Sequence, residues 1–426
     1  MTESSKPVPP LGGSFQGDEE LKGDQVRKWR GYSSREKTSL RLQLTKGNWD
    51  RGGDISHFAF LNTSLLFPTA IIGRSGPVST LSQAVKPPAI GDCDLKFLCG
   101  RSLSFDSYVE SSSLDGIIIL RRGEIVYEKY PRMRPKDRHI IFSIGKVYVS
   151  TLVAILEDRG LVSNDDPIDR YIPELASSGW KGVKIIDILD MASGIEAPEE
   201  VEGAYTDPTT KHYQFEASLG WLPNVETLPE LARSESTYEF LATLARYEKP
   251  GLMHDYASVN TCVLGWLVER VTGCAIADVI ADEIWSRIGA EADALVTVNS
   301  RGVAAVHGGI ITTLRDLARF GLLFTPSREA ITADAVISSA YMKKIRELGR
   351  AELLEEPGRD TGSRHATYQW DDVWHDGSFF KSGFGGQGLY IHPDKDLVVA
   401  FFGTHGYTDT GPPPEFVCRH VLNNFF

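Results

Sequence analysis

Residues 137–146 read Asp-Arg-His-Ile-Ile-Phe-Ser-Ile-Gly-Lys, and no other stretch of the chain says as much about its architecture. A short apolar run, 140–142, leads into a serine and a lysine three positions apart, Ser143 and Lys146. Apolar residues then recur at helical spacing, which predicts a helix over about 143–159 that Gly160 would end. Because positions three apart share one face of a helix, the Lys146 amine is expected near the Ser143 hydroxyl.

A serine beside a lysine is the smallest arrangement that supplies a nucleophile together with a base. A serine hydroxyl is a poor nucleophile unless a neighbouring group takes its proton. A neutral lysine can do so when burial and nearby cations lower the lysine pKa. The simpler alternative is a serine that only caps the helix. Ser178 and Lys181 have the same spacing, but they fall in a predicted loop.

Two further segments could add side chains to such a site. Tyr256-Ala257-Ser258-Val259-Asn260 precedes a predicted helix and offers a phenol and a hydroxyl, although Ser258 or Asn260 could simply be a cap. Lys381-Ser382-Gly383 belongs to a glycine-rich strand and offers a cation, a hydroxyl and an open backbone edge. The alternative for this last segment is an ordinary glycine-containing strand or bulge.

The order of predicted elements is strands, helices, strands and a last helix. Apolar runs at 117–120 and 125–127 flank a glycine and indicate a hairpin. A sheet built from both ends of the chain, with a helical insertion, accounts for this order. The predicted organisation is an extended arm over 1–55 with little structure of its own, a sheet domain from 56–160 and 300–426, and a mainly helical domain over 161–299. The site would lie in the cleft between the last two, and a final helix is predicted over 414–426.

The composition and charge of the chain limit the classes of partner that are expected. The chain has 426 residues, 45 Lys and Arg against 57 Asp and Glu, and a formal net charge of −12, so neither nucleic acid nor an anionic membrane is expected as a partner. Its five cysteines include no C-x-x-C pair and predict reduced thiols. The polar first residues do not resemble a signal peptide, and no apolar run approaches a membrane span, so a cytoplasmic protein is expected. No clustered ligand set calls for a metal, and no cofactor is expected.

Taken together, the three motifs and several longer blocks resemble the β-lactamase-related serine hydrolases, most closely the 6-aminohexanoate-dimer hydrolases. The blocks include LVSNDDPIDRYIPEL, YASVNTCVLGWLVERVTG and HGGIITTLRDLARFG, in that order. The resemblance implies an α+β, β-lactamase/transpeptidase-like fold. In it, an antiparallel sheet from both chain ends is flanked by helices and carries an all-helical insertion.

The resemblance also assigns roles. Ser143 would be acylated, Lys146 and Tyr256 would move protons, and the backbone N–H groups of Ser143 and Phe384 would form the oxyanion hole. Class C β-lactamases carry Asn where this chain has Ser258, so efficient β-lactam turnover is not expected. Lys381 is absent from the nylon-dimer enzymes and would suit a substrate carboxylate. The residues expected to bind substrate are Tyr205, Glu216, Ser258, His307, Lys381, Ser382 and Gly383.

The expected function is hydrolysis of a small linear amide or peptide bond through an acyl-enzyme, with loop 196–228 setting substrate choice. Two alternatives stay open: a carboxylesterase or acyltransferase of the same fold, and a non-catalytic penicillin-binding homologue. The expected partner is a small amide, peptide or ester, including one that bears a carboxylate, because Lys146 and Lys381 would make the cleft cationic. The resemblance makes a homodimer possible.

Overall fold

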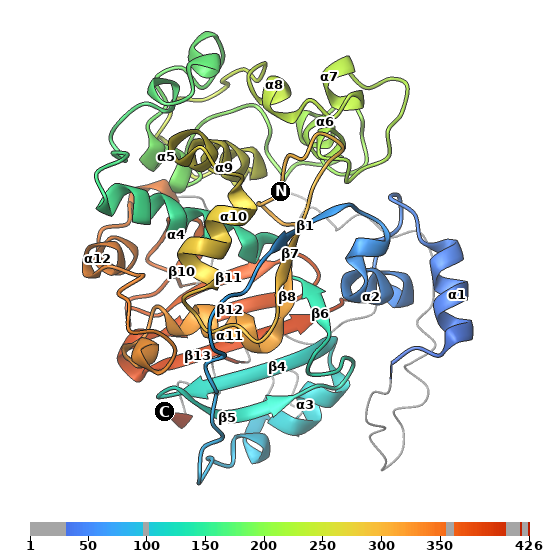
Figure 1. Cartoon of the computed structure of the whole chain (residues 1–426), viewed down its shortest axis with the longest axis vertical. Coiled ribbons are helices and arrows are strands. Elements are labelled where there is room, and N and C mark those ends of the chain that lie inside the picture. The colour runs from blue at the N-terminus through green and yellow to red at the C-terminus, as the bar shows by residue number, and fades with distance from the viewer. Residues whose placement is uncertain (1–30, 97–101, 355–361, 406–417, 420–424) are drawn as a thin grey trace, which may run out of the picture.

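The computed structural model describes residues 31–96, 102–354, 362–405, 418–419 and 425–426. Its main sheet is antiparallel throughout and joins segments from both sides of the helical region (Figure 1). This confirms the predicted sheet. In spatial order the strands are β5 (Glu124–Lys129), β4 (Leu114–Arg121), β13 (Leu397–Gly403), β12 (Gln387–His392), β11 (Phe379–Gly383), β10 (Trp370–Val373) and β9 (His365–Thr367).

The predicted hairpin is formed by β4 and β5. Arg121 pairs with Glu124, so Arg122 and Gly123 make a two-residue turn with φ values of 50° and 75°. Positive φ at both central positions matches the twist of the flanking strands, and glycine adopts it without steric cost.

A second, four-stranded sheet lies beside the helical region. Its order is β1 (Thr69–Ile72), β7 (Ala294–Thr297), β8 (Ile310–Thr313) and β6 (Arg138–Ile140). The sequence predicted one sheet, whereas the structure places these four strands in a second sheet. Because β7 pairs with β1 in register from Thr69 to Ile72, the end of the 161–299 segment belongs to a sheet rather than to the helical region.

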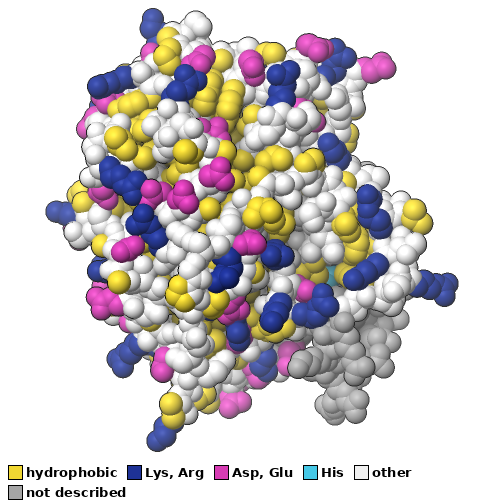
Figure 2. Space-filling view, viewed as in Figure 1, with side chains coloured by type: hydrophobic (Ala, Val, Ile, Leu, Met, Phe, Trp, Pro, Cys, Tyr) yellow, Lys and Arg dark blue, Asp and Glu magenta, His cyan; other side chains and the backbone are white. Residues whose placement is uncertain are grey.

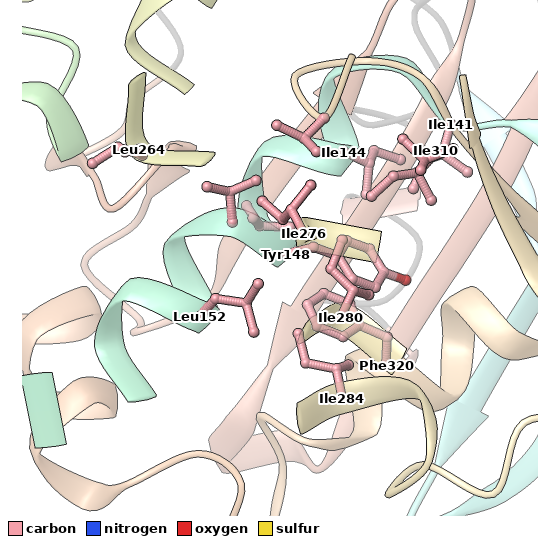
Figure 3. Close-up of a cluster of buried hydrophobic side chains, with 14 of the residues drawn as sticks. Ile141, Ile144, Tyr148, Leu152, Leu264, Ile276, Ile280, Ile284, Ile310 and Phe320 are labelled. Atoms are coloured by element: carbon pink, nitrogen blue, oxygen red, sulfur yellow. The ribbon is translucent and has the colours of Figure 1, made fainter. Parts of the chain in front are cut away.

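Helix α4 (Gly145–Asp158) runs through the middle of the molecule, and Gly145 to Leu156 are all buried. It packs against α9 (Ser258–Thr272) and α10 (Ile276–Ile280). Figure 3 shows Ile144, Tyr148 and Leu152 among the isoleucines of neighbouring elements. Burying an aliphatic or aromatic side chain of this size stabilises the fold by roughly 1.5–3 kcal/mol. The start of α4, where Ser143 lies, is thereby held firmly.

The remaining helices cover the two sheets and build the upper part of the molecule in Figure 1. α11 (Leu314–Leu322) packs on β13 and β4. The other helices that cover the sheets or build this upper part are α3 (Phe105–Ser111), α5 (Ile185–Leu189), α6 (Lys211–Ser218), α7 (Glu230–Arg233), α8 (Thr237–Leu241) and α12 (Ser339–Glu347).

The extended arm predicted over 1–55 is wrong where the structure describes it. α1 spans Ser34–Gln43 and α2 spans Gly53–Leu61. Ser33 and Glu36 form a capping box that satisfies free N–H groups at the start of α1. Trp49, between the two helices, is only 2% exposed, so this part of the chain is packed into the core. The helix predicted over 414–426 lies largely outside the described residues.

Basic and acidic side chains are interspersed over the face shown in Figure 2. Within the described ranges, none of the helices combines the length and the apolar character that a bilayer crossing requires.

Candidate active site

The segment before Ser143 is held in an unusual backbone conformation. After β6, Phe142 adopts a φ of 45°, which costs a bulky residue roughly 1–3 kcal/mol. Its ring stacks on Trp49 with centroids 5.6 Å apart and meets Phe60 edge-on at 4.9 Å. This packing holds the turn that presents Ser143 at the start of α4.

A close approach of β11 brings the third motif to the same place. A Cβ on Gly383 would lie 2.4 Å from the Ile141 carbonyl oxygen. Only glycine allows this separation, because any side chain would overlap the backbone before Ser143. Gly383 therefore contributes space, and the prediction that it helps to form the site has a steric basis.

Lys146 is fully buried and directed at Ser143. Its Nζ donates hydrogen bonds to Ser143 Oγ at 3.0 Å, Ser258 Oγ at 2.8 Å and the His307 carbonyl oxygen at 3.1 Å. Burial lowers the pKa of Lys146 to about 8; Glu199 opposes that shift, and Lys381 reinforces it. A lysine with this pKa is neutral in an appreciable fraction of molecules near neutral pH, as a general base must be.

The hydroxyls of both motif serines face this amine and do not cap helices. α4 has no side-chain cap at its amino end, and neither does α9, whose N-cap is Ala257. The capping alternatives for Ser143 and Ser258 are therefore wrong. Asn260 is fully buried two residues inside α9, so it does not cap that helix either.

The ring of Tyr256 lies near both lysine amines, with its centroid 4.7 Å from Lys381 Nζ and 5.0 Å from Lys146 Nζ. Lys381 Nζ donates to the Tyr256 hydroxyl at 3.0 Å and to the Asp371 carboxylate. Asp371 also accepts from the backbone and side chain of Ser382, at 2.8 and 2.6 Å. Burial raises the pKa of Tyr256 well above its ordinary value, Asp371 and Glu199 add to the rise, and a hydrogen bond with Ser143 opposes it.

A cavity of about 150 Å³ opens at Ser143. Its apolar walls include Trp221, Leu222 and the half-exposed ring of Phe384. The backbone N–H of Phe384 donates to no other described residue. The predicted residues that line the cavity are Ser143, Tyr205, Glu216, Ser258, His307 and Phe384. Lys146, Tyr256 and Lys381 are not part of this lining; Lys146 donates to Ser143 and Ser258 in it, and Lys381 donates to Tyr256.

One carboxylate and one imidazole form a buried pair at the cavity wall. His307 Nε2 lies 3.0 Å from Glu216 Oε1, and its Nδ1 lies 3.6 Å from Cys262 Sγ. Burial raises the pKa of the Cys262 thiol, so this cysteine is an inert structural thiol. Glu216 and His307, which were both predicted near the site, are thus brought together in it.

The charge of the cavity differs from the expectation. Its lining includes Asp50, Glu199 and Glu216 but only one guanidinium, that of Arg51. The expected cationic cleft is therefore wrong. Lys146 lies behind the lining, and Asp371 compensates the charge of Lys381.

Sequence reasoning missed three contributions to the site. Glu199 accepts from the Ser258 N–H and, at 3.0 Å, from the Tyr205 hydroxyl. Asp371 pairs with Lys381, and residues 49–51 supply a wall of the cavity. A signal existed for Asp371 alone: it lies on a strand directly before β11, where a hairpin register places it beside Lys381. Within the described residues, no cluster of His, Cys, Asp and Glu could hold a metal ion.

The sequence of this chain is similar to those of known proteins. The beta-lactamase family model matches residues 113–415. A 6-aminohexanoate-dimer hydrolase from Paenarthrobacter ureafaciens is 30% identical over 359 residues, which cover 83% of this chain and 87% of the relative.

Solved structures agree on the fold. A Bacillus anthracis protein assigned to the 6-aminohexanoate-dimer hydrolases superimposes with a TM-score of 0.76 at 20% identity, covering 90% of this chain and 95% of the other. A family VIII carboxylesterase does so with a TM-score of 0.54 at 16% identity, covering 76% and 95%. With the antiparallel sheet and the paired Ser143 and Lys146, these matches show that the chain belongs to the beta-lactamase family and is a hydrolase of its serine-dependent branch.

Proposed function

We propose that this protein hydrolyses a small linear amide through an acyl-enzyme on Ser143. The observation that carries the proposal is the 3.0 Å hydrogen bond between Lys146 Nζ and Ser143 Oγ, made by a lysine whose pKa burial lowers to about 8. In its neutral form Lys146 takes the serine proton as Ser143 Oγ attacks the carbonyl carbon. The Ser143 and Phe384 N–H groups would stabilise the oxyanion, and each such donor typically contributes about 3 kcal/mol.

The two proton carriers divide the work because their pKa values move apart. Burial lowers the pKa of Lys146 and raises that of Tyr256. Lys146 is therefore the better base, and Tyr256 keeps its proton and can give it to the leaving amine. Water then cleaves the acyl-enzyme and restores the serine. Opposed pKa shifts on neighbouring groups commonly mark an acid and its base.

The cavity supports a substrate with a protonated amine beyond an apolar chain. Asp50 Oδ1 and Glu216 Oε2 are buried and accept no hydrogen bond from a described residue, so an ammonium group would find acceptors there. Trp221 and Leu222 suit the chain between that group and the scissile carbonyl. The Paenarthrobacter relative is named for a 6-aminohexanoate dimer, a linear amide of this shape.

A carboxylate at the other end of the substrate stays a prediction. Lys381, the side chain expected to bind it, is fully buried and already pairs with Asp371. Arg51 is the guanidinium on the cavity wall, but its Nε lies 3.7 Å from Asp50 Oδ1, at the end of the cavity proposed for the amine. Ser382 also faces Asp371, so its contribution is to hold that carboxylate. The possible homodimer and a cytoplasmic location stay predictions too.

Covalent labelling tests the nucleophile. A fluorophosphonate probe should add its mass to the peptide that carries Ser143, and Ser143→Ala should lose both labelling and turnover while melting within a few degrees of the wild type. Ser178→Ala, in the second match to the same spacing, is the control and should label normally. An unlabelled wild-type Ser143 would refute the proposal and favour the non-catalytic alternative.

A substrate panel separates the amide proposal from its esterase and acyltransferase alternatives. Short linear amides with and without a terminal amine should be compared with p-nitrophenyl esters, with and without an added alcohol acceptor. We expect the amine-bearing amides to give the highest kcat/KM. Esters turned over with amides left intact would support a carboxylesterase, and preferential transfer to the alcohol would support an acyltransferase.

A further inference from the structure

Glu199 holds both ends of the Tyr256–Ser258 segment, and nothing in the proposed reaction yet uses it. Its backbone N–H donates to the Tyr256 carbonyl oxygen at 3.2 Å. Its carboxylate accepts from the Ser258 N–H, at the first residue of α9. One residue therefore fixes the segment that carries the phenol and the hydroxyl of the site.

The contact with α9 replaces a missing cap. The first N–H groups of a helix have no partner within the helix, and the N-cap residue of α9, Ala257, has no side chain that could accept one. The Glu199 carboxylate takes this position from a distant loop. A negative charge also suits the positive end of the dipole of α9, a helix of 15 residues.

The same carboxylate also binds a tyrosine of its own loop, the loop expected to set substrate choice. Tyr205, which lines the cavity, donates its hydroxyl to the second Glu199 oxygen at 3.0 Å. Glu199 thus joins three parts of the site: the loop that carries Tyr205, the Tyr256–Ser258 segment, and, through Ser258 Oγ, the Lys146 amine.

Glu199 is also a counter-charge for Lys146. All three hydrogen bonds of Lys146 go to uncharged oxygens. Burial tends to raise the pKa of Glu199, but Lys146, His212, the hydrogen bond from Ser258 and His307 together outweigh burial and lower that pKa to about 2, so the carboxylate is ionised. The charged and titratable groups that face Lys146 are Glu199, Glu216 on α6, Tyr256, the His307 segment, Asp371 on β10 and Lys381 on β11.

We propose that Glu199 is a positioning residue, which couples the Tyr205 loop to the Tyr256–Ser258 segment and to the proton of Lys146. It acts through Ser258 and Tyr256 and touches no reacting atom. The inference rests on the proposed function, since it concerns the reactivity of Ser143.

The test measures the rate at which a fluorophosphonate labels Ser143 between pH 5 and 10, which requires no knowledge of the natural substrate. Glu199→Gln keeps an oxygen acceptor but removes the charge, so the midpoint of the acid-side decline in labelling should move to lower pH. Glu199→Asp keeps the charge but shortens the reach, so labelling should slow roughly tenfold with the midpoint retained. Tyr205→Phe should slow it only a few-fold.

Glu196→Gln is the matched control, because Glu196 is an exposed carboxylate of the same loop, and it should behave as the wild type. Failure to label the wild type would sink the proposed function itself. Normal labelling of the wild type, with the same rate and midpoint in Glu199→Gln and Glu199→Asp, would overturn the role of Glu199 and leave the proposed function intact. Thermal melts of each variant establish that it is folded.

Discussion

The two lysines of the site, Lys146 at the start of α4 and Lys381 on β11, are equally buried but have different surroundings. Both side chains are inaccessible to solvent. Lys146 donates to three uncharged oxygens, whereas Lys381 pairs with the Asp371 carboxylate. Burial therefore lowers the pKa of Lys146 to about 8, while Lys381 has a direct counter-charge in Asp371.

The difference teaches how one cleft uses the same side chain twice. A buried cation without a direct counter-charge is costly to the fold but is poised to lose a proton. A buried cation with a carboxylate partner instead orients its neighbours, here Tyr256 and Ser382. The cost of the first arrangement is placed where the chemistry requires it.

The largest effect should come from removing Lys146. Lys146→Met should lower kcat by about 10²–10⁴-fold, because Ser143 loses its base. The same substitution also removes the counter-charge of the buried Glu199 carboxylate, so stability at pH 7 should fall as well. Steady-state kinetics and urea unfolding on one preparation measure both; a variant that keeps its activity, or one that loses activity only because it is unfolded, would contradict this assignment.

The sequence alone predicted the two lysines and much of the fold, because those signals are local or follow chain order. The spacing of Ser143 and Lys146 needs only one turn of helix, and the β4–β5 hairpin needs only a glycine between two apolar runs. The order of the three motifs indicated the family resemblance, and that resemblance implied the remaining features of the fold and the roles of the site residues.

What the sequence did not predict depends on contacts between distant segments. Glu199 meets Ser258 across 59 positions of the chain, and Trp49 meets Phe142 across the whole first part of the fold. The stretch around Trp49 was predicted to be an arm because it is polar and contains several glycines, and its single buried tryptophan gives no periodic signal. The sequence pattern around Glu199 or Trp49 does not indicate which distant segment each residue contacts, so these contacts could not be predicted without the structure.

A smaller effect, seen in stability, is expected at Lys381. Lys381→Met leaves the Asp371 carboxylate buried without its cation, which should cost about 3–5 kcal/mol of unfolding free energy. Lys381→Met combined with Asp371→Asn removes the stranded charge and should recover most of that loss. Urea unfolding midpoints of the single and double variants measure the difference; a double variant as unstable as the single one would show that packing, rather than charge, explains the loss.

The smallest effect concerns the pH dependence of stability. Between the folded pKa of Lys146, about 8, and its ordinary value of 10.5, the unfolded chain holds a proton that the folded chain has lost. Stability contributed by this group therefore rises with pH across that window, by about 3 kcal/mol in all. Other groups also titrate there, so the quantity to measure is the difference in unfolding free energy between the wild type and Lys146→Met. That difference should shift in favour of the wild type from pH 8 to pH 10.5. A flat difference would mean that Lys146 keeps its ordinary pKa, and the contrast with Lys381 would then rest on geometry alone.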